Sequence, residues 1–494
     1  MNRIKIFFLL FVMVILSVSC YEDKGNYDYH PINEVSISGI QQEYEIERWD
    51  TLKIPVTMKN SLDQNRELVY AWYLDQKKIA ETRDLNYVVS EKAKKYDARF
   101  EVTDPANDSV RFFQDFEVAV RTMYATGLML LSECGEHPEI SFYNTQTNPT
   151  RKIVHDMFRL ENNKSLMGLP LSLEQAGMRY YGGVIFIHTS ASSHQLDPVL
   201  CKEMAVFDEN SFTEPNPVYD MIYCRFEDAI EEFGTAIGKD GRIYPKQSRQ
   251  NRFMSASLKP VYVEGKQERI DYALSPMALT TRNAVLTYDN ISGHFLYFYN
   301  SYDIPSYDEN QYDMVRMSKT HIGLPWLGWG FNMNGGSYGY SSLFYDAETN
   351  KAALVRAHSH TGNIRGQDSL VILKDHHLSP DSRMVISPAT NRLYYSDGGH
   401  KLYVLNLSDP EFKFASLDFE CGIPDNCRIT MLKLAANNLD LLIGVVSDRQ
   451  EKYNGDVYRI NAKDGTVVDY LKGFGGKPVD MIEKVAVDDY DVEE

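Results

Sequence analysis

The sequence predicts an all-β protein, with an N-terminal immunoglobulin-like sandwich followed by a C-terminal β-propeller of about seven blades. Three observations predict this fold class. The chain of 494 residues has 33 tyrosines and only 4 tryptophans, a bias that favours strands. Its first part contains short segments in which apolar and polar residues alternate. From residue 127 onward, one pair of strand-like segments recurs at a spacing of roughly fifty residues.

The first 19 residues form a predicted secretory signal. Two cations, Arg3 and Lys5, precede an apolar run at residues 6–16, and small residues follow it. The run is shorter than the roughly 20 residues that a membrane-spanning helix needs. Cys20 comes directly after a small residue, so the stretch resembles the lipobox of bacterial lipoproteins, although Ser17 stands where leucine is usual. In that case Cys20 carries the lipid and becomes the mature N-terminus. An ordinary signal peptide with an incidental cysteine is the alternative.

The residues after Cys20 predict where the anchored protein resides. The acidic pair Glu22 and Asp23 resembles the signal that sends Bacteroidetes lipoproteins to the outer face of the outer membrane. We therefore expect lipidation at Cys20, a tether at residues 20–30, and a lipid-anchored, surface-exposed protein on the outer membrane.

The composition is typical of an exported globular protein. Hydrophobic residues make up 43% of the chain, and the net charge is -18 without a long Lys/Arg run, so nucleic acid is not an expected partner. Beyond Cys20 the cysteines are Cys134, Cys201, Cys224, Cys421 and Cys427. The last two flank a loop with Gly and Pro, and they either form a disulfide or are two buried free thiols. The spacing of closed zinc sites is absent, and we expect no cofactor and no metal.

Residues 31–122 are predicted to form the sandwich. Short strand-like segments occur at residues 34–38, 50–57, 68–74 and 112–120. Roughly seven short strands in about ninety residues is the length scale of an immunoglobulin-like domain. Trp72 lies in the middle of its segment, so we expect it to anchor the core and to have no chemical role.

Five short phrases carry a family resemblance. They are Cys20-Tyr-Glu-Asp-Lys-Gly-Asn-Tyr-Asp-Tyr29, Ile32-Asn-Glu-Val35, Tyr70-Ala-Trp-Tyr73, Gly127-Leu-Met-Leu-Leu-Ser-Glu133 and Ile140-Ser-Phe142. They are similar to phrases of the Bacteroidetes lipoproteins called the PKD-like family, and we expect the resemblance to cover the whole chain. It implies an exported lipoprotein with a PKD-type sandwich, often encoded near starch-utilisation-type outer-membrane uptake systems. It brings no catalytic motif.

Residues 123–494 repeat one pattern, which predicts the propeller. A turn-rich stretch leads into an apolar strand, a tight turn, and a second strand that ends in Tyr, Asn or Asp. The second strands recur every fifty residues or so, roughly the period of kelch-like blades, and closure of such a ring leaves no long exposed sheet edge. A pair of ordinary β-sandwiches is the rival prediction. The second strands are anchored at Phe142, Phe207, Ile243, Tyr297, Phe344, Tyr403 and Val457.

The segment 321–340 is the strongest binding candidate in the sequence. It is rich in glycine and has no strand period, so we expect an exposed loop on one face of the propeller. Flat aromatic rings held in such a loop suit stacking on sugars or on the apolar parts of peptides. The alternative is that the loop folds over a blade edge and that both tryptophans cover the core. The aromatic residues of the segment are Trp326, Trp329, Phe331, Tyr338 and Tyr340.

An acidic, tyrosine-rich loop lies just upstream of this segment. Tyr302, Tyr307 and Tyr312 alternate with carboxylates, which could bind sugar hydroxyls or calcium. The EF-hand spacing is absent, however, and a solvated surface loop is the plainer interpretation. His358 and His360 share one face of a predicted strand, but the sequence identifies no third ligand for a metal.

No local motif predicts an enzyme, because the nucleophile elbow, zincin helix, Walker loop and dinucleotide fingerprint are all absent. The leading hypothesis is a cell-surface lipoprotein that binds an extracellular glycan or glycopeptide. It would be accessory to an outer-membrane nutrient-uptake system, whose proteins are possible partners. One alternative is a propeller-type polysaccharide lyase or hydrolase. The other is a structural or assembly lipoprotein that binds another protein.

Overall fold

The chain divides into two compact units, Met1–Arg121 and Thr122–Glu494, next to the boundary expected between residues 122 and 123. The signal, Cys20 and the tether lie outside the described residues. Within the described part of the chain, no helix is long and apolar enough to cross a membrane. The computed structural model describes residues 33–485 except 63–66, 107–109, 146–152, 177–182, 213–218, 227–233, 240–242, 247–260, 264–265, 270–272, 277–278, 282–283, 300–314, 318–319, 335–336, 361–362, 365–368 and 409–414.

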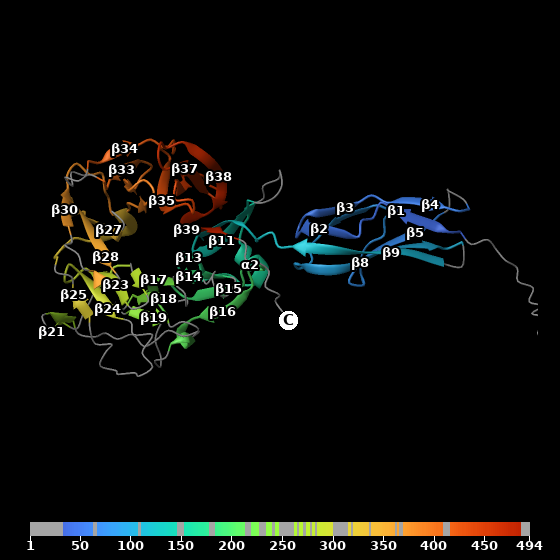
Figure 1. The fold of residues 1–494 in the computed structure, drawn as a ribbon, viewed down its shortest axis with the longest axis horizontal. Helices are drawn as coiled ribbons and strands as arrows, with labels where there is room; N and C mark the ends of the chain where they lie inside the picture. Colours follow the sequence, from blue (N-terminus) through green and yellow to red (C-terminus); the bar gives the residue numbers. More distant parts are fainter. Residues whose placement is uncertain are drawn as a thin grey trace, which may run out of the picture. The chain divides into compact units, whose positions relative to one another are not determined.

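The first unit consists of strands in two layers. One layer is a five-stranded sheet in the order β2-β9-β8-β5-β6, in which β2 runs parallel to β9. The pairs β1-β4 and β3-β7 form the other layer (Figure 1). The strands are β1 (Val35–Ser38), β2 (Glu43–Glu47), β3 (Thr51–Ile54), β4 (Thr57–Asn60), β5 (Val69–Leu74), β6 (Lys77–Ala80), β7 (Leu85–Val88), β8 (Lys94–Asp104) and β9 (Val110–Arg121).

Trp72 is the centre of the core of this unit, as the sequence predicts. Its side chain is fully buried, and its ring centroid lies 4.3 Å from that of Phe100. Its Nε1 donates to the carbonyl of Thr82 at 2.8 Å, which satisfies its one polar group. Strand β8 buries alternate residues because successive side chains of a strand point to opposite faces.

The second unit contains seven described sheets, which follow one another in chain order. Each sheet is named here by its edge strand: β39, β13, β17, β22, β26, β31 or β35. The short helix α2 (Met157–Asn162) and the 3-10 helix η1 (Glu209–Ser211) lie between strands.

The first four of these sheets hold the following strands. The β39 sheet has β10 (Gly127–Cys134), β11 (His137–Asn144), β12 (Ile153–Val154) and β39 (Lys477–Lys484). The β13 sheet has β13 (Pro170–Ala176), β14 (Val184–Thr189), β15 (Ser193–Leu196) and β16 (Glu203–Phe207). The β17 sheet has β17 (Met221–Phe226), β18 (Gly234–Gly238) and β19 (Ile243–Lys246). The β22 sheet has β20 (Val261–Val263), β21 (Lys266–Arg269), β22 (Leu279–Thr281), β23 (Ala284–Asp289), β24 (His294–Tyr299) and β25 (Val315–Met317).

The other three sheets complete the unit. The β26 sheet has β26 (Trp326–Asn334), β27 (Ser337–Asp346), β28 (Lys351–His360), β29 (Asn363–Ile364) and β30 (Ser369–Leu373). The β31 sheet has β31 (Met384–Ser387), β32 (Arg392–Ser396), β33 (Leu402–Asn406) and β34 (Leu417–Phe419). The β35 sheet has β35 (Cys427–Leu434), β36 (Asp440–Ser447), β37 (Gly455–Asn461) and β38 (Val467–Gly475).

The seven anchors expected from the sequence fall in seven different sheets. They lie on β11, β16, β19, β24, β27, β33 and β37, in chain order. The repeat of roughly fifty residues in the sequence therefore corresponds to one sheet per repeat.

The two ends of the second unit meet in one sheet. The last strand, β39, is antiparallel to the first, β10, and Leu130 faces Met481 in the register. In Figure 1 the sheets pass from teal through yellow to red, and the red β39 joins the sheet that holds the teal β11. Gly476 permits this approach, because a Cβ there would lie 2.2 Å from the carbonyl oxygen of Glu133.

Buried apolar clusters join neighbouring sheets. The β39 sheet packs on the β13 sheet, for example, through Leu131, Phe142, Leu173 and Ile187. The core of the unit thus lies between sheets rather than in one central layer. The other described clusters join the β13 and β17 sheets, the β22 and β26 sheets, the β26 and β31 sheets, the β31 and β35 sheets, and the β35 and β39 sheets.

Candidate ligand-binding cavity

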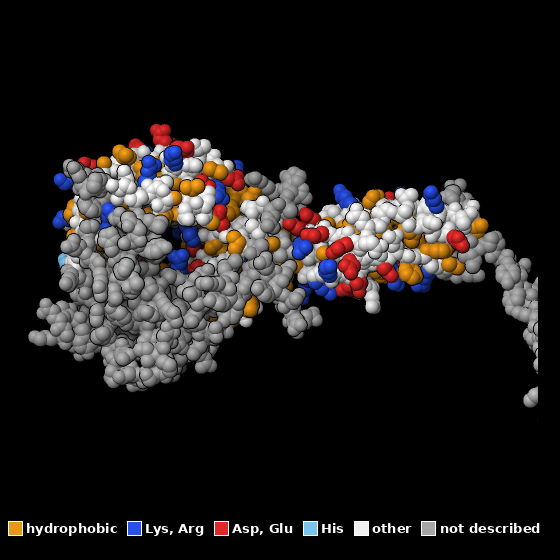
Figure 2. All heavy atoms as spheres, in the orientation of Figure 1, with side chains coloured by type: hydrophobic (Ala, Val, Ile, Leu, Met, Phe, Trp, Pro, Cys, Tyr) orange, Lys and Arg blue, Asp and Glu red, His pale blue; other side chains and the backbone are white. Residues whose placement is uncertain are grey.

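Edge strands from four sheets of the second unit line one cavity, which we call the edge-strand cavity. Strands β13, β17, β35 and β39 contribute to it, together with Arg383 before β31 and Pro276 before β22. Its volume is about 320 Å³, near the lower end of the range of small-molecule sites. In Figure 2, Lys and Arg side chains lie beside the hollow in this unit. The polar side chains of the lining include those of Ser172, Tyr223, Arg225, Arg383, Thr430, Lys433 and Asp480.

Arg383 is held in the cavity wall by backbone carbonyls. Its Nε donates to the carbonyl of Thr430 at 3.1 Å, and its Nη1 donates to the carbonyls of Asp381 and Ser382 at 3.2 and 3.1 Å. No ion pair joins Arg383 to a carboxylate among the described residues. The side chain stays open to solvent, but desolvation by the surrounding protein lowers the pKa of its guanidinium. The charge of Asp381 raises this pKa and the charge of Arg428 lowers it, and the net direction is downward. Because an arginine stays charged in proteins, the site carries a cation without a bonded counter-ion.

Arg428 brings a second guanidinium to the same region. It lies near the start of β35, is exposed, and is close enough for its charge to act on Arg383. Like Arg383, it forms no ion pair in the described part of the chain. Two like charges near one another are unfavourable unless an anion or solvent lies between them.

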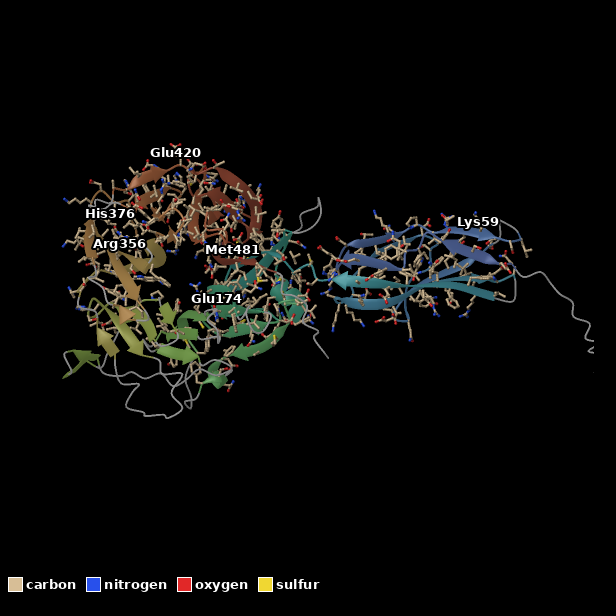
Figure 3. All side chains as sticks on the ribbon, viewed as in Figure 1. Lys59, Glu174, Arg356, His376, Glu420 and Met481 are labelled. Atoms are coloured by element: carbon tan, nitrogen blue, oxygen red, sulfur yellow. The ribbon has the colours of Figure 1, made fainter. Side chains whose placement is uncertain are left out.

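The remaining charges of the lining are paired. Lys433 Nζ lies 2.6 Å from Oδ1 of Asp480, whose Oδ2 accepts the N–H of Leu173 at 2.8 Å. Arg225 Nε lies 3.8 Å from Oε1 of Glu174 on β13. Figure 3 labels Glu174 and Met481, which mark the neighbouring edge strands β13 and β39.

A buried polar network includes Glu174, the partner of the lining residue Arg225. Oε2 of Glu174 accepts the N–H of Phe226 at 2.6 Å and lies 3.4 Å from Nε2 of His188. The Nδ1 of His188 is 2.6 Å from Oγ of Ser193, which is 2.5 Å from the hydroxyl of Tyr219. Burial lowers the pKa of His188, but the neighbouring Cys224 and Glu174 raise it, and the net direction is upward.

This network has the residue types of a hydrolytic triad but not its accessibility. His188 and Ser193 are both 0% exposed. A nucleophile must reach its substrate, so the network is better explained as the polar packing between the β13 and β17 sheets.

The prediction of an exposed loop at 321–340 is wrong, because most of this segment forms β-strands. Residues 326–334 and 337–346 form the paired strands β26 and β27. The glycines serve close packing: a Cβ on Gly328 would lie 2.5 Å from Cγ of Met384, and one on Gly330 would lie 3.0 Å from Cβ of Ile386. In the sequence these glycines suggest a loop. In the structure they allow β26 to pack closely against β31.

The predicted aromatic site is only partly described. Trp326 and Trp329 are half-buried and pack against the cluster between the β22 and β26 sheets. Nε1 of Trp326 is buried without a hydrogen-bond partner among the described residues. A role of these rings in stacking stays a prediction. Phe331 lies on β26, and Tyr338 and Tyr340 lie on β27, whereas Tyr302, Tyr307 and Tyr312 fall outside the described residues.

The five described cysteines are free thiols. Cys421 and Cys427 are both buried and form no disulfide. The same is true of Cys134, Cys201 and Cys224. Burial raises the pKa of Cys421 to about 11, so its thiol is not a ready nucleophile. In the described part of the chain, no group of three or more His, Cys, Asp or Glu side chains could hold a metal ion.

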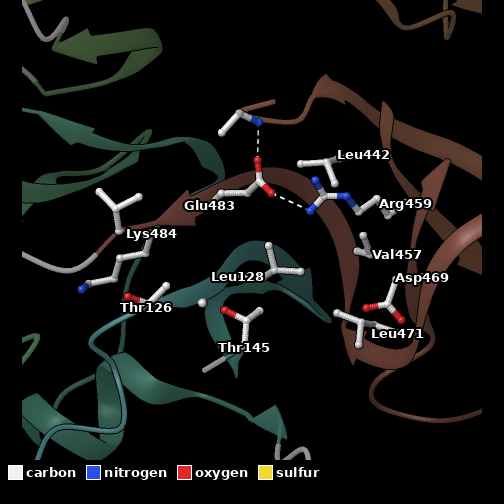
Figure 4. A pocket seen from close by; sticks show the side chains of 13 residues that line it. Thr126, Leu128, Thr145, Leu442, Val457, Arg459, Asp469, Leu471, Glu483 and Lys484 are labelled. Atoms are coloured by element: carbon white, nitrogen blue, oxygen red, sulfur yellow. Dashed lines mark hydrogen bonds and ion pairs between the residues drawn. The ribbon is translucent and has the colours of Figure 1, made fainter. Parts of the chain in front are cut away.

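A second hollow of about 320 Å³ lies between β10 and β36–β39 (Figure 4). Its arginine is neutralised twice: Arg459 Nη1 lies 2.8 Å from Glu483, and its Nε lies 2.8 Å from Asp440. Lys484 donates to the carbonyl of Ala125 at 2.8 Å. With its charges satisfied from within, this hollow is a weaker candidate for a ligand. Its aliphatic lining includes Leu128, Leu442, Val457 and Leu471.

Comparison with known proteins bears on the first third of the chain. Residues 20–170 match the PKD-like family. The resemblance predicted from the sequence is confirmed over that range. Every residue that lines the edge-strand cavity lies beyond residue 170, so the PKD-like match does not include the cavity.

Other comparisons give only distant likenesses. No curated protein matches the chain. A candidate 6-phosphogluconolactonase from Bacteroides uniformis is 12% identical, with a TM-score of 0.46, over 72% of this chain and 99% of that chain. Saccharomyces cerevisiae Sqt1 is also 12% identical, with a TM-score of 0.40, over 72% of this chain and 87% of that chain.

Sequence reasoning missed the residues of the cavity. Arg225, Arg383 and Lys433 of the lining, and Arg428 near it, belong to no motif, and they come from segments up to about two hundred residues apart. The one available signal was a cation within an apolar strand, as in Met221-Ile-Tyr-Cys-Arg-Phe226. A charged residue in such a strand indicates a specific role, because charged side chains are rarely buried without a partner.

Proposed function

We propose that the protein is a cell-surface lipoprotein, lipidated at Cys20, that captures an extracellular glycan or glycopeptide in the edge-strand cavity. It would be accessory to an outer-membrane nutrient-uptake system. The observation that carries the proposal is Arg383, a solvent-open guanidinium fixed by three backbone carbonyls and joined to no carboxylate of the described chain. A fixed donor in a small polar cavity is suited to orienting a polar ligand.

The proposed architecture of the second unit is a β-propeller of seven blades. Seven consecutive sheets, apolar clusters between neighbours, and the pairing of β39 with β10 support it. In such a ring, the edge strands surround a channel, and the edge-strand cavity would be part of that channel. The export signal and the PKD-like match support the location and the lipoprotein class.

An array of glycans and glycopeptides tests the proposal directly. The mature chain, residues 20–494, is applied beside the variants Arg383→Ala and Arg159→Ala. Arg159 is an exposed arginine of α2, with 54% of its side chain accessible, and serves as the matched control. We expect binding to fall at least about tenfold in Arg383→Ala, the loss of a charged hydrogen bond, and to persist in Arg159→Ala. Binding that survives Arg383→Ala would place the ligand elsewhere.

Two further readouts separate the other hypotheses. Trp326→Ala and Trp329→Ala should leave binding intact if the ligand binds in the edge-strand cavity. They should abolish binding if the ligand stacks on the predicted aromatic rings. Chromatography of the bound glycan after long incubation tests the lyase or hydrolase alternative, because a non-catalytic protein returns its ligand uncut.

A further inference from the structure

We propose that the ligand of the edge-strand cavity carries an anionic group, and that it is the acidic sugar of an extracellular glycan. This inference rests on the proposed function and names its substrate class. It is carried by the charge, the geometry and the size of the cavity.

The charge of the cavity is opposite to that of the chain. The net charge of the chain is -18, yet three cations and one carboxylate belong to the lining: Arg225, Arg383, Lys433 and Asp480. Asp480 neutralises Lys433, and Glu174 lies beside Arg225. Arg383 then remains without an ion pair in the described part of the chain, and the charges of Asp381 and Arg428 near it are of opposite sign. A concave site of one sign focuses the field and attracts the opposite ion.

The hydrogen-bonding capacity of Arg383 points to an oxygen anion. A guanidinium has five N–H groups. The Nε–H and the two N–H groups of Nη1 are directed to the carbonyls of Thr430, Asp381 and Ser382. The two N–H groups of Nη2 have no acceptor among the described residues. They can donate to a carboxylate or a sulfate, the charge-assisted bonds that arginine forms best.

The same carbonyls hold the guanidinium in place before a ligand arrives. A fixed fork loses less conformational entropy on binding than a free side chain does. Thr430 is itself fixed, because its hydroxyl donates to the carbonyl of Pro478 at 2.7 Å. Arg383 is therefore tied to β35 and, through Thr430, to β39.

The size of the cavity favours a small anionic unit rather than a folded partner. About 320 Å³ is near the minimum for a small-molecule site. It suits the end of an oligosaccharide better than an extended peptide. The hydroxyl of Ser172 donates within the protein, to the carbonyl of Cys224, and its oxygen can accept a hydrogen bond from a hydroxyl group of the sugar.

The test uses acidic oligosaccharides beside their neutral counterparts. The probes are carboxylated oligomers with their methyl esters, and sulfated oligomers with their desulfated forms. The mature protein and the variants Arg383→Gln, Arg383→Lys, Arg428→Gln and Arg159→Gln are titrated at low and high salt. Thermal unfolding of each variant confirms that it is folded.

We expect an acidic probe to bind at least about tenfold more tightly than its neutral counterpart, with a difference that shrinks in high salt. Arg383→Gln should weaken the acidic probe about tenfold to a hundredfold and leave the neutral one unchanged. Arg383→Lys should retain part of the affinity, Arg428→Gln should weaken it less, and Arg159→Gln should not change it. The carboxylated and sulfated series show which anion is preferred.

The contrary results are distinct. If neutral glycans bind as tightly as acidic ones, and Arg383→Gln affects both alike, the ligand is not anionic although the proposed function stands. If no glycan of either kind binds, both the proposed function and this inference fail.

Discussion

Lys433 on β35 and Asp480 on β39 form an ion pair, with 2.6 Å between Nζ and Oδ1, and the second carboxylate oxygen of Asp480 accepts the N–H of Leu173 on β13. One carboxylate thus connects the edge strands of three sheets. It is also the only carboxylate among the described residues that line the edge-strand cavity. The residue that stabilises the wall therefore also sets the charge of the cavity.

Asp480→Asn should destabilise the protein and strengthen the binding of an acidic ligand. The loss of the pair should lower the free energy of unfolding by about 1–3 kcal/mol. Removal of the one negative charge should raise the affinity for an acidic probe about threefold to tenfold. Lys433→Met is the matched variant: it breaks the same pair but should lower that affinity. If the two variants shift affinity in the same direction, stability and not charge controls binding.

The pair of Arg449 and Asp456 should make stability depend on acid pH. Asp456 is 1% exposed, and the guanidinium of Arg449 contacts both its oxygens, at 2.8 and 2.5 Å. Burial raises the pKa of Asp456, but Arg449 and the N–H of Gly473 outweigh it, and the net direction is downward. A carboxyl group with a lowered pKa stabilises the fold above its unfolded pKa of about 3.9 and loses that effect as the pH falls.

Asp456→Asn should therefore cost about 3 kcal/mol at neutral pH, and the difference from the wild type should shrink as the pH falls below about 4. Denaturant unfolding at a series of pH values measures it. A difference that stays constant down to low pH would show that the charge of Asp456 is not the stabilising element.

Gly328→Ala should destabilise the packing of β26 on β31. The added Cβ would lie 2.5 Å from Cγ of Met384, and overpacking of this kind typically costs about 1–3 kcal/mol. Met384→Ala makes room, so the double variant should be less destabilised than the sum of the two single ones. Strict additivity in this cycle would mean that the two side chains do not meet.

Trp72→Ala should unfold the first unit. The side chain is fully buried against Phe100 and Phe116, and truncation of a buried Trp costs about 3–5 kcal/mol. Near-ultraviolet circular dichroism and limited proteolysis of the whole chain report the loss. Trp72→Phe, which keeps most of the apolar volume, should cost less. Equal losses for both variants would locate the main contribution in the bond from Nε1 to Thr82.

Cys20→Ser should release the protein from the membrane. If Cys20 carries the lipid, the variant loses its anchor and appears in the soluble fraction, while the wild type incorporates labelled fatty acid and is cut by protease added to intact cells. Cys134→Ser, which alters a buried free thiol, controls for a general effect of losing a cysteine. Membrane retention of Cys20→Ser would contradict the lipoprotein assignment.

The sequence predicts the all-β class and the PKD-like first unit well, because both depend on local patterns. Trp72 and its alternating neighbours define a core that short strands can form by themselves. The seven anchors also separate seven sheets, since each sheet is built from consecutive segments.

The cavity could not be predicted in the same way. Ser172, Arg383 and Asp480 meet only because edge strands of different sheets pack side by side, and no spacing in the sequence encodes that meeting. The glycines of segment 321–340 led to a wrong prediction of a loop for a related reason. Gly328 allows close contact with Met384, a residue in another sheet, and the sequence does not show that contact.

The most direct test of the account is a crystal structure of the mature protein with the tightest-binding glycan of the array. We predict the sugar in the edge-strand cavity, with an oxygen within hydrogen-bond distance of Nη2 of Arg383. A sugar bound in the hollow beside Arg459, or on Trp326 and Trp329, with the edge-strand cavity unchanged, would contradict the central claim.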